Sequence, residues 1–208
     1  MDRWRFLLML RHFNDTYTSE NWFRDLMDEK IANTFKRPEA WPSQKKIVHI
    51  LCYCLLDNHF HLLLKEIIEG GISMFMQKLG TSMANHFNEK YKEKGSLFQG
   101  PFRSRTINDD TYLRYGSAYI QVKNAFELFP EGPLIAGNNF EKAYAWATSS
   151  PYTSLGNYAG ARESPIIDKD ILGEIFTPAE MKSFVKDFIE GRQNILQDSI
   201  GHDSIFLE

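Results

Sequence analysis

Two histidines separated by a single residue are the part of this sequence best suited to metal chemistry. His59 and His61 flank Phe60 in the run HFHLLLKE, which has the composition of a β-strand. Because side chains alternate along a strand, both imidazoles would face one side, about 6.6 Å apart along the backbone, while Phe60 faces the core. Such a pair can hold one divalent metal ion, although a lone His-x-His also occurs at the ends of ordinary strands.

Three tyrosines share one stripe of a predicted helix that begins after Asn108 or Asp109, either of which can cap it, and that runs to about residue 124. They are Tyr112, Tyr115 and Tyr119, at positions i, i+3 and i+7. A tyrosine stripe usually faces a core, but Lys123 lies one turn beyond Tyr119 on the same stripe. A cation there could hold a phosphate or favour the phenolate, and a phenol with a pKa of about 10 needs such help to act as a nucleophile.

The elements that must position these residues read as a mixture of helices and strands. Strands are predicted over residues 5–13, 46–56, 59–66 and 97–107, with an Asp57-Asn58 turn between the second and third. Helices are predicted over residues 19–31, 72–91, 109–124, 140–146 and 178–191. The order lacks the regular βαβ rhythm, so we expect an α+β fold with a central, mainly antiparallel sheet.

The composition is that of an ordinary folded domain whose basic charge is concentrated in the middle of the chain. The 208 residues are 43% hydrophobic and 25% charged, with a net charge of −3. Between residues 77 and 105 six basic side chains stand against two acidic ones, whereas acidic side chains dominate after residue 160. A basic stretch is what phosphate contacts require, so this stretch is the predicted DNA-binding face. Its candidate phosphate contacts are Lys90, Lys92, Lys94, Arg103 and Arg105.

The two cysteines and the short apolar runs indicate a cytoplasmic protein. Cys52 and Cys54 are too close along an extended strand for an ordinary disulfide, so reduced thiols are expected. The apolar run near the start covers only residues 6–10, which is too short for a signal sequence or a membrane span. With His59 and His61, the cysteines also suggest an alternative, a structural zinc site, although Cys-x-Cys is not the usual spacing.

Several motifs follow one another in a specific order along the chain. They are DNHFHLLLKE, the FNEKY stretch, the GSLFQGPFRSR run, the tyrosine helix after paired aspartates, and AWATSSPYTSLGNYAG. Together they resemble the single-tyrosine HUH transposases, and most closely the REP-associated tyrosine transposases. The similarity extends over about residues 5–176.

The resemblance implies that His59 and His61 bind Mg²⁺ or Mn²⁺ and that Tyr119 is the nucleophile. The chain departs from the family pattern four residues after the tyrosine, where the family has asparagine and this sequence has Lys123. A protonated lysine cannot bind a metal, so the third ligand is left open between Gln121, Asn124 and water. The implied reaction is attack of Tyr119 on single-stranded DNA, which gives a 5′-phosphotyrosine and a free 3′-OH, with strand transfer as its reversal.

The resemblance also implies a ferredoxin-like or RRM-like palm, a short DNA hairpin near the cleavage point as the target, and action as a monomer or homodimer without a membrane partner. We expect a catalytic domain over residues 1–160 and an acidic helical appendage over residues 161–208. The alternative function is a hairpin-DNA-binding protein of the same fold that has lost turnover, which the departure at Lys123 keeps open.

Overall fold

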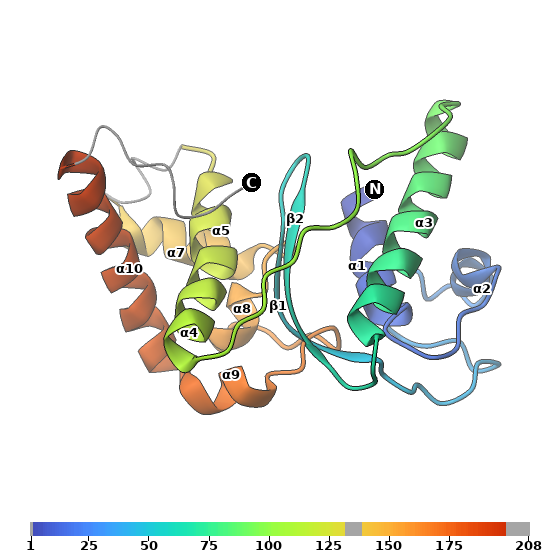
Figure 1. The fold of residues 1–208 in the computed structure, drawn as a ribbon, viewed down its shortest axis with the longest axis horizontal. Helices are drawn as coiled ribbons and strands as arrows, with labels where there is room; N and C mark the ends of the chain where they lie inside the picture. Colours follow the sequence, from blue (N-terminus) through green and yellow to red (C-terminus); the bar gives the residue numbers. More distant parts are fainter. Residues whose placement is uncertain (1, 132–138, 199–208) are drawn as a thin grey trace. The chain divides into compact units, whose positions relative to one another are not determined.

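A computed structural model describes residues 2–131 and 139–198, and for Lys123, Asn124 and residues 192–198 it describes the backbone alone. Its elements are α1 (Asp2–His12), α2 (Trp22–Asp28), β1 (Val48–Leu55), β2 (Phe60–Glu66), α3 (Gly71–Tyr91), α4 (Asp110–Ala118), η1 (Tyr119–Lys123), α5 (Asn124–Glu127), α7 (Phe140–Ser149), α8 (Leu155–Tyr158), α9 (Asp170–Ile175) and α10 (Pro178–Asp198). In the described residues the two strands form an antiparallel hairpin and the other elements are helical, so the predicted α+β class is confirmed (Figure 1).

The two strands form a hairpin whose first strand is buried along almost its whole length. A two-residue turn joins them, and the Leu56 amide donates to the His59 carbonyl across it at 2.9 Å. β1 is buried at every position except His49. Its other edge is covered in part by the segment around Thr153, which forms a bridge with Cys54. The strands predicted over residues 46–56 and 59–66 are therefore confirmed, with ends that differ by one or two residues.

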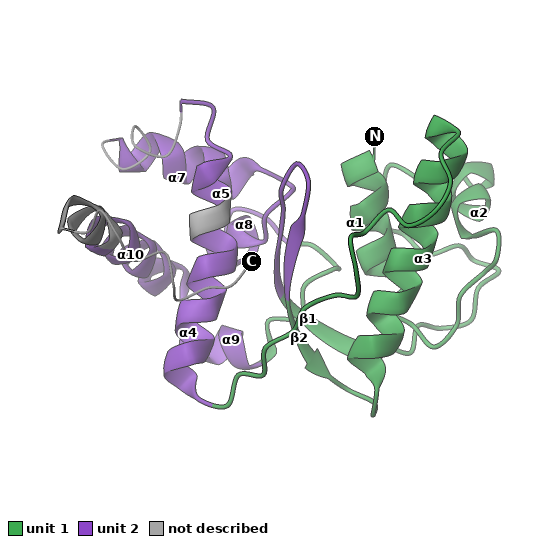
Figure 2. Ribbon diagram, turned by 45° about the horizontal axis from the view of Figure 1, so that its top comes forward, with its two compact units in different colours: residues 1–51, 63–108, 164–170 green, residues 52–62, 109–163, 171–208 purple. Residues whose placement is uncertain are grey.

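The chain forms two compact units, each of which is described by itself (Figure 2). Unit 1 comprises residues 1–51, 63–108 and 164–170, and unit 2 comprises residues 52–62, 109–163 and 171–208. The tip of the hairpin belongs to unit 2 and its open end belongs to unit 1. Unit 2 takes residues from both sides of position 160, and the predicted division into a catalytic domain and an appendage stays a prediction.

The first element of unit 1 is a helix, where the sequence predicted a strand over residues 5–13. α1 buries Leu7, Leu8, Met9 and Leu10 almost completely and packs against α3. Leucine and methionine are good helix formers, and the run contains no β-branched residue, so local propensity favours the helix. Four consecutive buried residues hide the amphipathic period by which a helix is ordinarily predicted. The strand prediction is wrong for that reason.

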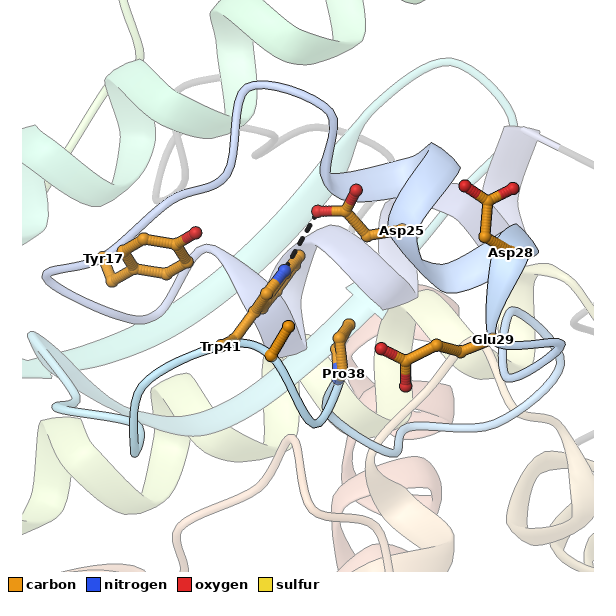
Figure 3. Close-up of a pocket in the computed structure, with 7 residues that line it drawn as sticks. Tyr17, Asp25, Asp28, Glu29, Pro38 and Trp41 are labelled. Atoms are coloured by element: carbon orange, nitrogen blue, oxygen red, sulfur yellow. Dashed lines mark hydrogen bonds between the residues drawn. The ribbon is translucent and has the colours of Figure 1, made fainter.

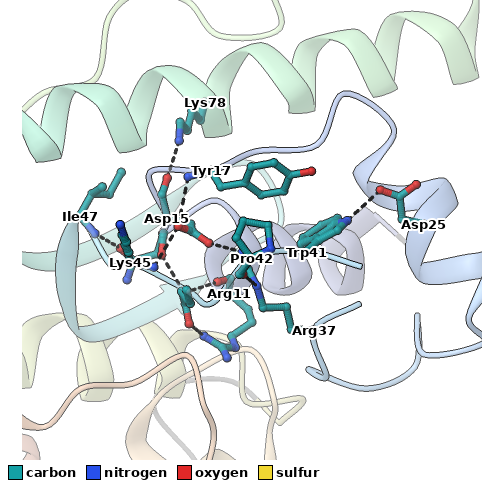
Figure 4. A network of polar contacts seen from close by, with 12 residues as sticks. Arg11, Asp15, Tyr17, Asp25, Arg37, Trp41, Pro42, Lys45, Ile47 and Lys78 are labelled. Atoms are coloured by element: carbon teal, nitrogen blue, oxygen red, sulfur yellow. Dashed lines mark hydrogen bonds and ion pairs between the residues drawn. The ribbon is translucent and has the colours of Figure 1, made fainter. Parts of the chain in front are cut away.

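A buried polar network holds the chain between α1 and β1 (Figure 4). The fully buried Asp15 carboxylate accepts hydrogen bonds from the amides of Tyr17 and Lys45 at 3.1 and 3.0 Å. It also forms an ion pair with Arg37 at 2.5 Å. The Lys78 ammonium donates to the Asp15 carbonyl at 2.5 Å, which attaches α3 to the same point. Because a buried carboxylate is costly unless it is paired, this network favours a single path for the chain into the hairpin.

Residues 97–107 contain no strand, so the strand predicted there is wrong. Gly100 and Pro101 interrupt the segment, and a proline has no amide hydrogen to donate to a ladder. From residue 99 to residue 106 every side chain is exposed, so no burial stabilises an extended pairing. Arg103 and Arg105 consequently do not lie on a strand, and the alternation from which a shared face was predicted does not apply.

Unit 2 contains a helical column that begins at the Asp109 cap. The Asp109 carboxylate accepts a hydrogen bond from the Tyr112 amide at 2.9 Å, as expected of a capping residue. α4 then continues through the π-helical turn η1 into α5 as one ribbon (Figure 1). α10 packs beside α4, since the rings of Tyr115 and Phe188 have centroids 5.6 Å apart.

The other predicted helices are present with different ends. The helix predicted over residues 19–31 is the shorter α2, and the one over residues 72–91 is α3. The short helix expected at 140–146 and the helix expected at 178–191 are α7 and α10, and both are longer than predicted. In the described ranges no helix combines the length and the apolar character that crossing a membrane requires.

Candidate active site

The histidine pair lies at the tip of the hairpin. The ring centroids of His59 and His61 are 5.0 Å apart, and the ring planes are nearly perpendicular at 89°. β2 begins at Phe60, so His59 belongs to the turn rather than to the strand that was expected to carry both histidines. The Nδ1 of His59 lies 2.6 Å from the side-chain oxygen of Asn58, which orients the exposed ring without help from the strand.

Tyr119 lies beside His61. Their ring centroids are 5.8 Å apart, and the ring planes again stand at 89°. Tyr119 is half-buried and is the first residue of η1, immediately after α4. His59, His61 and Tyr119 all belong to unit 2, and their rings form a row of two edge-to-face contacts.

The two neighbouring tyrosines of α4 have other surroundings. Tyr112 is 51% exposed and Tyr115 is 36% exposed. The Tyr115 ring contacts Phe188 of α10 in an edge-to-face arrangement. Tyr119 differs from them in its exposure, and its ring contacts a member of the histidine pair.

The turn that follows Tyr119 is π-helical rather than α-helical. In a π turn the backbone hydrogen bonds join residue i to residue i+5, which widens the turn, so one turn after Tyr119 ends between positions 123 and 124. The π turn therefore excludes neither Lys123 nor Asn124 from the tyrosine side of the column. The side chains of Lys123 and Asn124 lie outside the described part of the structure, and their predicted roles stay predictions.

Gln121 is fully buried and is bonded to a segment whose role the sequence did not predict. The Ser154 hydroxyl lies 2.9 Å from the Gln121 side-chain oxygen, and Ser154 is itself fully buried. Thr153 donates a longer hydrogen bond, 3.4 Å, to the Gln121 carbonyl. The only signal in the sequence was a run of small hydroxyl residues after Trp146, which by itself indicates no chemistry.

The histidine pair fits one part of an open metal site. Because Asn58 accepts the Nδ1 proton of His59, the lone pair lies at Nε2, and such outer contacts commonly orient imidazole ligands. Among the residues that the structure describes, no three His, Cys, Asp or Glu side chains come close enough to hold a metal ion. The alternative zinc site, which required Cys52 and Cys54 together with both histidines, is therefore not formed. Other ligands of a metal here would be water, a phosphate oxygen or a side chain of another type.

The predicted phosphate contacts lie in unit 1 and differ in their surroundings. The Lys90 ammonium lies 2.7 Å from the Asp2 carboxylate, which also bonds to His86 and Tyr91. Although burial raises the pKa of Asp2, the hydrogen bonds from Lys90, His86 and Tyr91 lower it to about 2, so this carboxylate stays charged. The remaining four contacts, Lys92, Lys94, Arg103 and Arg105, are exposed. Lys90 would therefore have to leave an ion pair in order to bind DNA.

Unit 1 also contains an acidic pocket with a volume of about 340 Å³. It is lined by Asp25, Asp28, Glu29, Tyr17, Pro38, Ala40 and Trp41 (Figure 3). The Asp25 carboxylate is fixed by the Trp41 indole at 3.0 Å and by the Ser19 hydroxyl at 2.6 Å. Three carboxylates repel a phosphate, so this pocket is not a candidate for binding the DNA backbone.

Comparison with known protein families accounts for just over half of the chain. A family model described as Transposase IS200 like matches residues 18–123. That span contains the histidine pair, the basic stretch and Tyr119. No curated protein and no solved structure matches the chain.

Proposed function

Because the chain belongs to the family of IS200-like transposases, which are single-tyrosine enzymes of the HUH type, we propose that it cleaves and rejoins single-stranded DNA through a covalent bond to Tyr119. The observation that carries the proposal is the ring contact between Tyr119 and His61, with centroids 5.8 Å apart. A nucleophile and the groups that bind the scissile phosphate must lie within one phosphate-sized space. The general activity, transposition, follows from membership of the family. The chemical step at Tyr119 is what we propose.

In the proposed reaction the Tyr119 oxygen attacks the scissile phosphorus in line with the departing 3′ oxygen. The bond from phosphorus to the tyrosine oxygen forms while the bond to the 3′ oxygen breaks, the phenolic proton passes to water, and the 3′ oxygen leaves as a hydroxyl. The 5′-phosphotyrosine keeps the energy of the phosphodiester, so no ATP is needed. Attack by another 3′-OH restores a phosphodiester and releases Tyr119.

His59 and His61 would hold the divalent ion, which supplies charge stabilisation to the phosphate oxygens when it is bound. Mn²⁺ accepts imidazole nitrogen more readily than Mg²⁺, which prefers oxygen. For a third ligand we favour Asn124, because it follows the π turn that begins at Tyr119 and, unlike a protonated lysine, an asparagine offers an oxygen donor. Gln121 is less suitable, since its oxygen already accepts from Ser154. Lys123 remains a candidate phosphate contact.

The substrate we propose is single-stranded DNA with a short hairpin near the cleavage point. The resemblance to the REP-associated group supports the hairpin, and the basic stretch supports contacts with its phosphates. The exposed side chains of Lys92, Lys94, Arg103 and Arg105 carry the charge that such contacts need.

The proposal is tested with a pool of hairpin oligonucleotides that have randomised single-stranded flanks and a label at the 3′ end. The full chain is incubated with the pool and Mn²⁺, and the products are separated on a denaturing gel. A 5′-phosphotyrosine joins the protein to the 3′ part of the cleaved strand, so a labelled protein band is expected. The same pool labelled at its 5′ end should give none.

Tyr119→Phe and Tyr115→Phe form a matched pair for this assay, because each removes one hydroxyl from the same helical column. Tyr119→Phe is expected to abolish the adduct, and Tyr115→Phe is expected to retain it because Tyr115 contacts Phe188. An adduct that survives in Tyr119→Phe and disappears in Tyr115→Phe would refute the assignment.

A hairpin-binding protein without turnover is the second candidate, and Lys123 at the position of the family asparagine favours it. Such a protein would retard a hairpin oligonucleotide on a native gel. It would give no adduct with Mn²⁺ or Mg²⁺ at any DNA concentration, and this outcome separates the two functions.

A further inference from the structure

Ser154 is held against the backbone of β1 on the edge opposite β2. The Tyr53 amide donates to the Ser154 hydroxyl at 3.0 Å, and the Ser154 amide donates to the Tyr53 carbonyl at 2.9 Å. The Leu55 amide donates to the Tyr152 carbonyl at 2.8 Å, two residues further along the same strand. Because these bonds involve backbone on both sides, the position of Ser154 follows the position of the strand.

The same serine reaches the π turn that begins at Tyr119. Its hydroxyl lies 2.9 Å from the Gln121 side-chain oxygen, and both residues have no exposed surface. The neighbouring Thr153 hydroxyl donates to the Gln121 carbonyl at 3.4 Å. A π turn inside an α-helix is uncommon and needs tertiary contacts to persist, and side chains that bond into the helix backbone are one source of such contacts.

Arg162 fixes the loop that carries Thr153 and Ser154. Its guanidinium donates to the carbonyls of Thr148, Ser150 and Thr153. A Cβ at Gly156 would come within 2.2 Å of the Thr148 carbonyl, so only glycine fits between the loop and Arg162. The loop therefore has little freedom to move away from Gln121.

We propose that Ser154, acting through Gln121, is a positioning residue that holds Tyr119 against the histidine pair. This inference rests on the proposed function of Tyr119 as the nucleophile. Both sides of the site are positioned by β1. The strand leads through the Asp57-Asn58 turn to His61, and its other edge binds Ser154. The serine thus sets the distance between the nucleophile and the metal-binding pair, although it touches neither DNA nor metal.

Gln121→Met is the variant that separates positioning from folding. Methionine keeps the length of the side chain and removes the amide. The nitrogen of this amide has no hydrogen-bond partner among the described residues. Ser154 keeps its bonds to the Tyr53 backbone in this variant, so no buried hydroxyl loses its last partner. The midpoint of urea unfolding should stay the same or rise, while the bond from Ser154 to the π turn is lost.

The single-turnover rate of adduct formation is then measured for Gln121→Met, Ser154→Ala and a matched control, Ser117→Ala. Ser117 is also fully buried and lies two residues before Tyr119, but its hydroxyl bonds to the Arg114 carbonyl of its own helix. We expect both linked variants to lose about tenfold to a hundredfold in rate at unchanged hairpin affinity, because a displaced nucleophile loses alignment and not binding. The control should stay within about twofold of the wild type.

Mn²⁺ affinity and the NMR signals of the His61 ring complete the test without any DNA. A positioning role leaves Mn²⁺ affinity unchanged in Gln121→Met, whereas a tenfold loss would make Gln121 a ligand and overturn the inference. The Tyr119 ring shifts the His61 ring protons, so both linked variants should move these signals toward those of Tyr119→Ala, and Ser117→Ala should not. Wild-type His61 signals in both linked variants would overturn the inference. If the wild-type protein forms no adduct, the proposed function is refuted instead. The NMR signals then still test whether Ser154 and Gln121 position Tyr119 beside His61.

Discussion

The rings of His61 and Tyr119 meet edge to face, with centroids 5.8 Å apart, although the two residues are 58 positions apart in the chain. His61 is carried by a strand whose partner is buried, and Tyr119 by a helical column capped at Asp109. Neither local element dictates the meeting. The contact is made within unit 2, where the hairpin tip and the column belong to one compact body.

The first prediction concerns metal dependence at this contact. EDTA should abolish adduct formation, Mn²⁺ should restore it, and His61→Ala should lower the rate by at least about a hundredfold, because a bound metal supplies several kcal/mol of charge stabilisation. His49→Ala is the matched control, since it removes an imidazole on the same hairpin that lies in unit 1, 3.6 Å from the Asp168 carboxylate. The rates are measured in single-turnover adduct assays. Full activity of His61→Ala in EDTA would contradict the metal site.

The second prediction concerns the cap of the tyrosine column. Asp109→Ala removes the acceptor for the Tyr112 amide and should lower the free energy of unfolding by about 1 kcal/mol. Urea unfolding measures this loss, and Asn108→Ala, one residue earlier in the chain, is the control that should change it little. An equal loss in both variants would mean that the cap at Asp109 has no special role.

The hairpin and the long helices could be predicted from the sequence, because each has a local cause. Residues 46–56 are rich in β-branched and aromatic side chains, the Asp57-Asn58 turn has its own chemistry, and α3 has a clear apolar period. α1 could not be predicted in the same way, since its buried leucines leave no polar face to reveal the helical period.

The π turn and its link to Ser154 lay beyond sequence reasoning for a different reason. An α-helical spacing was assumed through residues 109–124, and no local pattern marks where one extra residue enters a turn. The bond from Ser154 to Gln121 joins residues 33 positions apart, and its existence depends on how β1 and the loop pair. Contacts of this kind appear only when the tertiary arrangement is known.

The third prediction concerns the pH dependence of stability through His12. Burial, followed by the charges of Arg11 and Arg37, lowers the pKa of His12 to about 4, so the folded protein keeps this imidazole neutral. The unfolded chain takes up the proton near its ordinary pKa of about 6.5, so stability is retained above that value and lost as the pH falls from 6.5 toward 4. The loss between about pH 7 and pH 5 should be about 2 kcal/mol. Urea unfolding at both pH values measures it, and His12→Phe, whose ring can pack against Trp41, should lack this part of the loss.

The fourth prediction concerns the ion pair that holds Lys90. Asp2→Asn should release the ammonium and strengthen hairpin binding by about threefold to tenfold at low salt, with a gain that shrinks as salt screens the phosphates. Asp28→Asn is the control, because it removes an equal charge from the acidic pocket without releasing a lysine there. Fluorescence anisotropy across a salt series measures both affinities. If the gain comes from Lys90, adding Lys90→Ala to Asp2→Asn should cancel it, and an equal gain in Asp28→Asn would show that net charge alone is responsible.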